Sequence, residues 1–383
     1  MIKPTFALLL SLWACASVPH RADAFTWAVE QDGSGDFTII QDALDAAAPG
    51  DSILIGPGRF DTFRPGVSVV DGYRFSAIAW VRTPDLTLIG SGRDSTVLGP
   101  LVPVLEVDGQ YSCSLYIDGG APTHVEALGL DNTALPGTIR AQSVMDACRV
   151  TREPLLRSYG VATGVVAGIE IRNTQFRGPN GVITAAATES LTIEDCEFED
   201  DSLEGTAVMI GNGGTNCVVR RCSIRGGSTG VAFGFGGSGV VEDCDLQGMS
   251  FSGINVDSGT AVIRRCVIGA TRQTLRVNVA SVEVSDCVLE GGTQATIATW
   301  GTLVVRTSHI LNSGVAPTVL GWTSAPGNTV DLRHNWWGTA DVEQIEAWID
   351  NRYGTVLWQP IADAVVPTES SSMSALKGNF KRD

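Results

Sequence analysis

A cysteine recurs in one sequence context through the middle of the chain, and this repeat restricts the fold more than any other feature. The context is apolar-x-apolar-x-x-Cys-x-apolar, as in VVRRCSI and VIRRCVI. Successive cysteines are separated by 26, 22, 22 and 21 residues. They are Cys196, Cys222, Cys244, Cys266 and Cys287. Thr174 and Ser308 hold the same place in the flanking repeats, and Cys148 extends the register toward the N-terminus.

Each repeat contains two short runs of alternating apolar residues with one extra residue at their junction, then a glycine-rich turn and a third short run. Alternation with a period of two is typical of strands. Three short strands per repeat without a crossover helix predict a parallel β-solenoid, whose coils stack about 4.8 Å apart. The pattern resembles the right-handed parallel β-helix of the pectin-lyase-like superfamily over nearly all of 25–360. We therefore expect an all-β fold, a right-handed parallel β-helix solenoid, and the resemblance does not specify an activity.

The repeated cysteines are expected to form a buried stack, because residues at one register position of a solenoid lie above one another and point the same way. A separation of about 4.8 Å between coils exceeds the Cβ–Cβ distance of about 3.5–4.5 Å that a disulfide requires. Thr174 and Ser308 in the same slot fit a small packing residue better than a metal ligand or redox group. We predict that these cysteines are free and structural.

The two residues before each stacked position alternate in charge from one repeat to the next. They are Arg172-Asn173, Glu194-Asp195, Arg220-Arg221, Glu242-Asp243, Arg264-Arg265, Ser285-Asp286 and Arg306-Thr307. Stacking is expected to place each arginine between carboxylates of the coils above and below, where opposite charges attract. We interpret the pairs as a structural ladder that also disfavours a slipped register, and not as catalytic arginine–carboxylate pairs.

The chain divides into a leader, a body and a tail. Residues 1–24 have the form of a secretory signal peptide, with one lysine in MIKPT, the apolar stretch FALLLSLWACASV and Ala22-Asp23-Ala24 as the cleavage site. The product is predicted to be secreted or at the cell surface; a lipoprotein anchored through Cys15 is the alternative. Residues 25–362 are predicted to form the β-helix with its end caps, and 363–383 a flexible tail. No later stretch approaches the ~18 apolar residues of a transmembrane helix.

The N-terminal end of the solenoid is expected to be closed by a helix near 39–48, because an open end exposes unpaired strand edges and core. Thr38 and Gln41 have the spacing of a capping box. The segment looks like the opening of many β-helix proteins, pectin methylesterases among them.

A second cap helix is predicted near 341–352 at the C-terminal end. Its expected apolar stripe is Val342, Ile345 and Ile349. Trp336, Trp337 and Trp348 are expected to fill this cap, whereas Trp300 and Trp322 are left open as a platform on which sugar rings stack.

The charge balance narrows the range of partners. The chain carries 26 basic and 42 acidic residues, a formal net charge of −16. Such acidity disfavours nucleic acid as a partner. The four histidines are scattered along the sequence, so no metal site is predicted. No cofactor is assigned; Ca²⁺ would be required by a polysaccharide lyase of this fold. The predicted partner is a polysaccharide or a cell-surface component.

A candidate binding patch lies on the outer face of the third short strand of two adjacent repeats. Asn255 and Arg276 are 21 residues apart at matching positions, and Asp257 and Asn278 repeat the relation two residues on. This grid of amide, carboxylate and guanidinium suits sugar hydroxyls, and the arginine can pair with an acidic substituent. The alternative is a solvated face whose polar residues satisfy one another.

Three functions remain open. The first is a secreted β-helix that binds polysaccharide, or serves as a surface structural module, without an evident catalytic site; no catalytic residue is assigned. The second is a polysaccharide-active enzyme, a lyase, hydrolase or esterase, with its site in the insertions 60–83 and 100–123. The first insertion supplies both charge signs through Asp61, Arg64, Asp71, Arg74 and Arg82. The third is an adhesin attached through its tail. The missing catalytic motifs favour the first.

Overall fold

The computed structural model describes residues 23–362, with short gaps. The gaps are 71–72, 153–158, 165–166, 185–186, 271, 315–316, 322–328 and 351–354. The predicted tail, Asp71, Trp322 and all but the last two residues of the predicted leader lie outside the described residues. Their assignments, and the domain boundaries with them, stay predictions.

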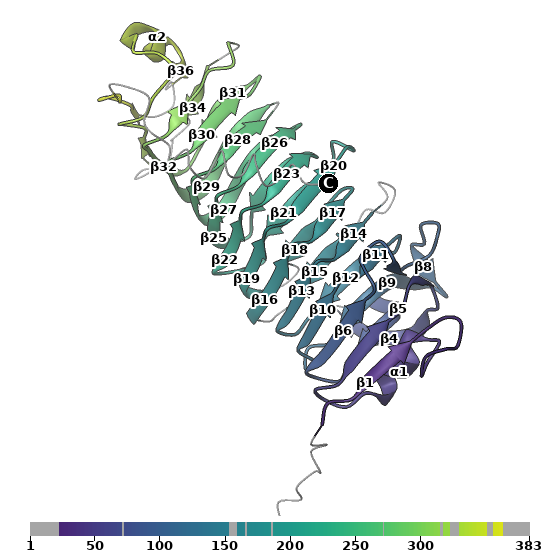
Figure 1. Ribbon diagram of the computed structural model, residues 1–383. Coiled ribbons are helices and arrows are strands. Elements are labelled where there is room, and N and C mark those ends of the chain that lie inside the picture. Colours follow the sequence, from purple (N-terminus) through teal and green to yellow (C-terminus); the bar gives the residue numbers. More distant parts are fainter. Residues whose placement is uncertain are drawn as a thin grey trace, which may run out of the picture.

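The chain winds into a long solenoid of parallel strands (Figure 1), so the predicted all-β, right-handed parallel β-helix is confirmed. One coil is represented by β19 (Glu189–Glu194), β20 (Glu197–Asp200) and β21 (Thr206–Ile210), each of which pairs in parallel with its counterpart in the next coil. The strands therefore form three faces, which we name A, B and C in chain order.

Face A and face C belong to one 26-stranded sheet, and face B is a separate 11-stranded sheet. Face A comprises β1 (Thr26–Val29), β2 (Ser52–Ile55), β6 (Leu86–Gly90), β10 (Thr123–Glu126), β13 (Ser143–Asp146), β16 (Ala167–Arg172), β19, β22 (Cys217–Arg220), β25 (Ser238–Glu242), the second halves of β27 (Ser252–Arg264) and β29 (Gln273–Ser285), β32 (Thr302–Arg306), β35 (Val330–Asp331) and β37 (Val356–Leu357). Face B comprises β3 (Gly58–Phe60), β7 (Thr96–Leu98), β11 (Gly129–Asp131), β14 (Arg149–Thr151), β17 (Gln175–Arg177), β20, β23 (Ser223–Gly226), β26 (Asp245–Met249), β28 (Val267–Ala270), β30 (Val288–Gly291) and β33 (His309–Ile310). Face C comprises β5 (Tyr73–Val81), β9 (Gln110–Ile117), β12 (Leu135–Ile139), β15 (Val161–Thr163), β18 (Val182–Thr184), β21, β24 (Thr229–Phe233), the first halves of β27 and β29, β31 (Ala295–Thr299), β34 (Val319–Gly321) and β36 (Ile349–Asp350). Two further strands, β4 (Arg64–Val70) and β8 (Glu106–Val107), pair antiparallel with β5 and β9.

The corner between face A and face B is made by the single extra residue that interrupts the alternation in each repeat. This residue has a positive φ near 50° in successive coils. The corner residues are Asn173, Asp195, Arg221, Asp243, Arg265, Asp286 and Thr307. Asparagine and aspartate tolerate this left-handed conformation, whereas other side chains pay about 1–2 kcal/mol for it. Arg221 and Arg265 therefore need compensation at their own positions.

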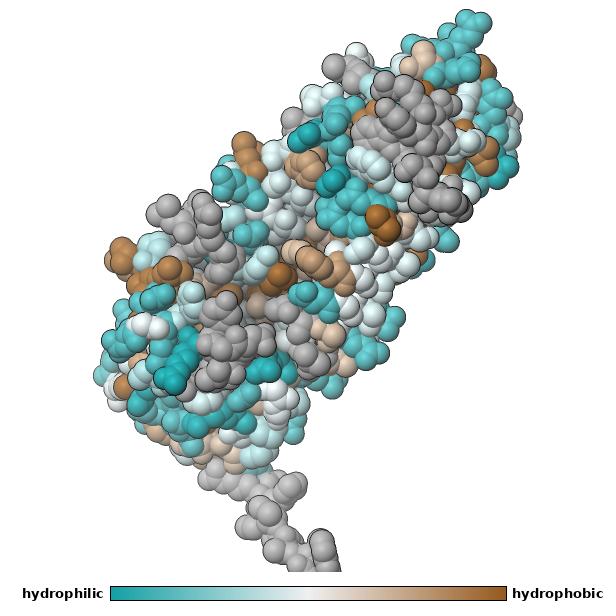
Figure 2. Space-filling model, turned by 180° about the vertical axis from the view of Figure 1, so that it is seen from behind, coloured by the Kyte–Doolittle hydropathy of each residue, from teal (hydrophilic) through white to brown (hydrophobic). Residues whose placement is uncertain are grey.

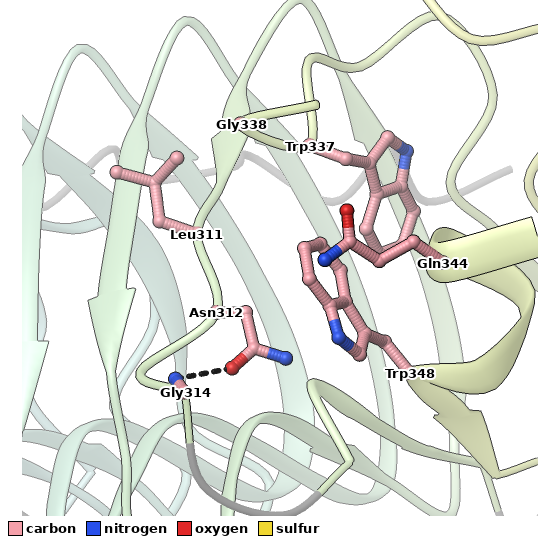
Figure 3. Close-up of a pocket in the computed structure, with 7 residues that line it drawn as sticks. All are labelled: Leu311, Asn312, Gly314, Trp337, Gly338, Gln344 and Trp348. Carbon is pink, nitrogen blue, oxygen red and sulfur yellow. Dashed lines mark hydrogen bonds between the residues drawn. The ribbon is translucent and has the colours of Figure 1, made fainter. Parts of the chain in front are cut away.

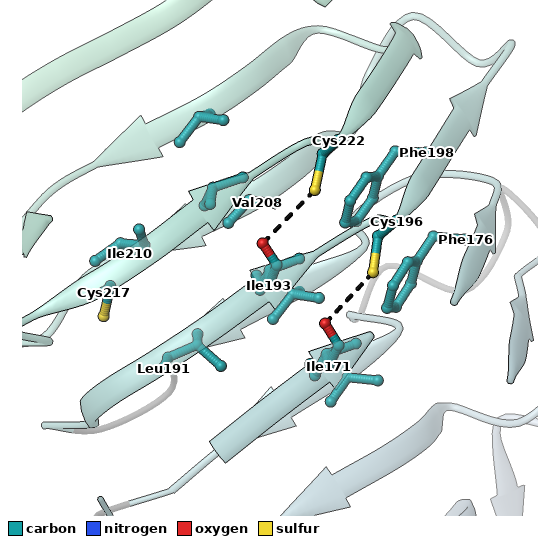
Figure 4. Close-up of a cluster of buried hydrophobic side chains, with 14 of the residues drawn as sticks. Ile171, Phe176, Leu191, Ile193, Cys196, Phe198, Val208, Ile210, Cys217 and Cys222 are labelled. Atoms are coloured by element: carbon teal, nitrogen blue, oxygen red, sulfur yellow. Dashed lines mark hydrogen bonds between the residues drawn. The ribbon is translucent and has the colours of Figure 1, made fainter. Parts of the chain in front are cut away.

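The residue after each corner is the stacked slot, and it both packs and donates a hydrogen bond. The thiol of Cys196 donates to the carbonyl of Glu194 at 3.2 Å, and the hydroxyls of Thr174 and Ser308 donate to the carbonyls two residues earlier at 2.8 Å. The thiol also approaches the preceding coil, where Ile171 O lies 3.5 Å from Cys196 Sγ (Figure 4). The slot thus selects small residues with a donor, a requirement that size alone did not predict.

The stacked cysteines are buried and free, as predicted, together with Cys113, Cys148 and Cys217. The slot packs beside a column of aromatic and aliphatic core residues. Within it the rings of Phe176 and Phe198 stack with centroids 4.6 Å apart (Figure 4). Dispersion and loss of water contact across such columns hold successive coils together.

The alternating charges form clasps between pairs of coils. Arg221 grips Asp195 with two nitrogen–oxygen contacts of 2.9 and 2.8 Å, and Arg265 grips Asp243 in the same way at 2.7 and 2.8 Å. The preceding arginines, Arg220 and Arg264, bind glutamates of the same lower coils.

The prediction that each arginine lies between carboxylates above and below is therefore wrong for these two pairs. Within the described part of the chain, the guanidinium groups of both pairs form their ion pairs with carboxylates of the preceding coil. A guanidinium fork that binds one carboxylate side-on directs its donors to one side, which explains the difference. These bidentate contacts compensate the left-handed backbone of Arg221 and Arg265.

The N-terminal end is covered by α1 (Ile40–Ala46), which lies at the purple end of the solenoid (Figure 1). Ile40, Ala43 and Leu44 are buried against the first coils. The capping box of Thr38 and Gln41 is wrong, because the helix begins one residue later and its N-cap residue makes no side-chain hydrogen bond. Gln41 is buried and instead bonds the backbone N–H and C=O of Trp80, at 2.8 and 3.2 Å.

The C-terminal end carries α2 (Val342–Ala347), whose first turn is capped by Asp341 accepting from the Gln344 N–H at 3.2 Å. Ile345 is buried, but Val342 is 43% exposed and Ile349 belongs to β36, so the three-residue stripe is wrong. The helix is shorter than the pattern indicated, and Trp337 supplies the buried bulk instead. In the described part of the chain, the helices are too short to span a bilayer.

An aspartate in the last described coils joins two arginines. Asp331 is mostly buried; it accepts hydrogen bonds from Arg333 at 2.9 and 2.7 Å and from Arg306. The hydrogen bonds from Arg333, followed by those from Arg306, hold the pKa of Asp331 well below its usual range.

We expect thiol labelling to distinguish packed from bridged cysteines. Burial raises the pKa of Cys113 and Cys148 to about 12, and it also raises that of Cys196, so the native protein should react very slowly with a thiolate-selective reagent. After denaturation without reductant, mass spectrometry should find a label on each of the eight described cysteines. Disulfide-linked peptides among the stacked cysteines would contradict the packing role.

A second prediction concerns acid stability. Because the folded-state pKa of Asp331 is lowered, its contribution is present above the unfolded value of about 3.9 and is lost as pH falls toward the folded value. Asp331→Asn should lower the free energy of unfolding by about 1–3 kcal/mol near neutral pH, since it removes the charged acceptor of two arginines. The difference from the native protein should shrink below about pH 4 in urea titrations. The exposed Asp61→Asn is the control, and a pH-independent difference for Asp331→Asn would refute this role.

Candidate functional site

The outward-facing residues of face C form a column along the solenoid. In its middle, two adjacent coils carry polar residues in place of apolar ones. Strand register places these residues in sequence: Ala162, Ile183, Met209, Ala232, Asn255, Arg276, Ala298 and Leu320. Six of these eight residues are apolar, and the two polar ones are adjacent. The same register continues to Thr138 before Ala162 and to Asp350 after Leu320, so polar residues also stand near both ends of the column. Asn255 and Arg276 are therefore a local pair of polar residues in its middle.

The structure brings the four predicted patch residues together around one carboxylate. Asn255 Nδ2 donates to Asp257 Oδ2 at 3.2 Å, and Asn278 Nδ2 donates to Asp257 Oδ1. Arg276 Nη1 lies 3.8 Å from the same carboxylate. The side chain of Asp257 is 52% exposed, so it keeps lone pairs directed to solvent. The patch residues thus hydrogen-bond to one another, yet the carboxylate of Asp257 remains accessible to a ligand.

Asn255 is less accessible than its outward position implied. Its exposed fraction is 8%, and its Oδ1 has no hydrogen-bond partner among the described residues. A buried acceptor left in this state costs about 1–3 kcal/mol. Asn255 therefore acts mainly through its amide N–H, which positions Asp257.

Two aromatic side chains complete the patch, and the sequence reasoning did not place them in it. The guanidinium carbon of Arg276 lies 5.3 Å from the ring centre of Phe251 and 5.6 Å from that of Trp300. Arg272 also lies over the Phe251 ring, at 5.3 Å. Such cation–π contacts contribute about 0.5–2 kcal/mol and restrict the arginine to one orientation. Trp300 follows a residue in register with Val277, so extending the predicted register by one coil would have identified it beside Asn278.

The surface around the patch mixes charge with exposed apolar groups. Arg272 and Arg276 outnumber the one carboxylate, which makes the patch locally basic on a chain of net charge −16. At the neighbouring corners Phe235 is 73% exposed and Val279 is 82% exposed. Seen from behind, the solenoid carries scattered brown apolar groups separated by polar surface (Figure 2).

The charges of the first insertion have a structural role. Arg64 and Arg82 form ion pairs with Asp42 and Asp45 of α1, the second at 2.6 Å. Arg82 also lies 4.5 Å from the ring centre of Trp80. These contacts fasten the β4–β5 hairpin to the cap helix, so two of the arginines proposed for an enzyme site are engaged elsewhere.

The patch has the chemistry of recognition. It offers a guanidinium, one carboxylate, amides and aromatic rings, which together hydrogen-bond, pair with anions and pack against ring faces. Hydrolysis of a glycosidic bond generally uses two carboxylates. The register pairs Val256 with Val277 and Ser258 with Val279, which places Asn278 beside Asp257, and among the four predicted patch residues Asp257 is the one carboxylate.

Comparison with known proteins bears on the fold. Residues 159–312 match the family model described as right handed beta helix region. Similar solved structures include pectate lyase Pel9A, at 14% identity and a TM-score of 0.46, covering 90% of this chain and 82% of that one. The periplasmic alginate epimerase AlgG has 9% identity and a TM-score of 0.46, covering 75% and 76%. PfbA, a surface adhesin of Streptococcus pneumoniae, has 10% identity and a TM-score of 0.45, covering 78% and 84%.

No curated protein matches the sequence well enough to serve as a relative. The solved structures differ in what their names say they do, and identities this low carry no activity across. The match over 159–312 agrees with the observed coils and with the resemblance based on the cysteine repeat. In fold, this chain is a right-handed parallel β-helix protein.

Proposed function

We propose that this protein binds an acidic polysaccharide on face C without cleaving it. The observation that carries the proposal is Arg276, which is held between Phe251 and Trp300 and stands beside Asn255 in the middle of the face C column. A guanidinium fixed in this way pairs with a carboxylate or sulfate of the ligand with little further loss of side-chain entropy.

The groups beside Arg276 suit the uncharged part of a sugar. Asp257 accepts hydrogen bonds from hydroxyls, and Asn278 adds an amide beside it. Above and below in the column lie Ala298 and Ala232, whose short side chains leave room for a polymer to continue along the axis. The site would therefore bind one acidic sugar residue within a longer polysaccharide chain.

The proposed location is outside the cell or at its surface. This part of the proposal rests on residues 1–24, which have the arrangement of an export signal. A polysaccharide or another cell-surface component is accordingly the proposed partner.

Glycan binding by the chain from residue 25 onward tests the proposal. Polygalacturonate and alginate oligomers should bind with an affinity that falls as salt is added, because an ion pair contributes. Arg276→Ala should weaken binding about tenfold or more, equivalent to about 1.4 kcal/mol, because the anion loses its charged partner. Isothermal titration calorimetry measures both effects.

The matched control is Arg177→Ala, which removes an exposed arginine from face B. Equal affinities of the Arg276→Ala and Arg177→Ala proteins for the acidic oligomers would refute the site. Release of unsaturated products or new reducing ends during the titration would refute binding without cleavage.

A further inference from the structure

A cavity lies at the C-terminal end of the solenoid, and it shares no lining residue with the face C patch. It is formed where Leu311 and Asn312, which follow β33, meet Trp337 and the cap residues Gln344 and Trp348 (Figure 3). Its volume is about 640 Å³. Pockets that bind small molecules typically measure about 300–1,000 Å³ and combine apolar walls with a few polar groups.

The polar groups of this cavity are carboxamides. Asn312 Oδ1 accepts from the backbone N–H of Gly314, which leaves Nδ2 as a donor on the side that faces Trp348 (Figure 3). Gln344 extends its amide from α2 over the same space (Figure 3). None of the seven lining residues is charged.

The apolar walls come from two indoles that the C-terminal cap alone does not explain. Trp337 is 1% exposed and fills the end of the core, as a cap requires. Its Nε1 nevertheless has no hydrogen-bond partner among the described residues. Trp348 packs against the core while remaining half-buried, so part of its ring lines the cavity.

We infer that this cavity is a binding site for a neutral saccharide, such as the end of a hexose chain. Indole rings pack against the apolar faces of sugar rings, and the two carboxamides exchange hydrogen bonds with hydroxyl groups. The lining offers no countercharge, so an acidic sugar would be desolvated there without a partner. The inference rests on the proposed function only for the ligand class, a saccharide, because both site and charge preference differ from those of the Arg276 patch.

The test measures tryptophan fluorescence and calorimetric binding with cellohexaose, maltohexaose and mannohexaose as probes. At least one of these neutral oligomers should bind, and Gln344→Leu should weaken that binding about five- to tenfold by removing a hydrogen-bonding amide of similar size. Asn312→Asp keeps the acceptor for Gly314 and removes the donor, so it should weaken binding similarly. Glu346→Gln, on the exposed side of α2, is the matched control.

The outcomes separate this site from the face C patch. Arg276→Ala should leave affinity for the neutral oligomers unchanged, while Gln344→Leu should leave affinity for polygalacturonate oligomers unchanged. Failure of all three neutral probes to bind, or equal binding by the Gln344→Leu and Glu346→Gln proteins, would overturn the inference. Binding that occurs only after deletion of 363–383 would also overturn it, because the tail would then be the occupant.

Discussion

The structure depends on a hydrogen bond that recurs at the corners between faces A and B from Cys148 to Ser308. A left-handed residue turns the chain there, and the next side chain donates to the carbonyl on the other side of the turn, as Cys196 does to Glu194 at 3.2 Å. A buried carbonyl without a donor costs about 1–3 kcal/mol. The repeated hydrogen bond removes this cost at successive corners. The same side chain points toward the preceding coil, which couples the turn to the stacking.

Ion pairs between coils help to fix the register of one coil on the next. Arg221 and Arg265 occupy left-handed positions that arginine disfavours, and each is gripped through two nitrogens by an aspartate one coil below. A slip by one residue would remove the aspartate from reach and turn core residues outward. The clasps therefore matter more for choosing the alignment of coils than for the net free energy of folding, to which exposed pairs contribute about 0.2–1 kcal/mol each.

The fold was predictable because the corner, slot and core positions recur with the coil. Cys222, Cys244 and Cys266 mark the same position in successive coils. The strands of each coil can therefore be placed from the sequence by counting from its cysteine. The same register placed Asn255 beside Arg276 correctly. It did not predict that Asn255 is 8% exposed, because the burial of a side chain depends on how its neighbours pack around it and not on register alone. The cap helices were harder to place than the coils, since a single short helix offers no repeat against which to check its ends.

The C-terminal cavity could not be predicted from the sequence, because its residues do not belong to the repeat. Asn312 belongs to a corner after face B, whereas Gln344 belongs to a helix that begins at Val342, and no periodic relation connects them. A solenoid repeats its coils and therefore repeats its surfaces, so a distinctive site arises only where the repetition stops. It stops within face C, where Asn255 and Arg276 stand together between the alanines of the neighbouring coils, and it stops at the cap, where Trp337 fills the end of the core. The interior slot holds small donors or apolar groups, whereas these two places carry arginine, amides and indoles, and for that reason we propose recognition there.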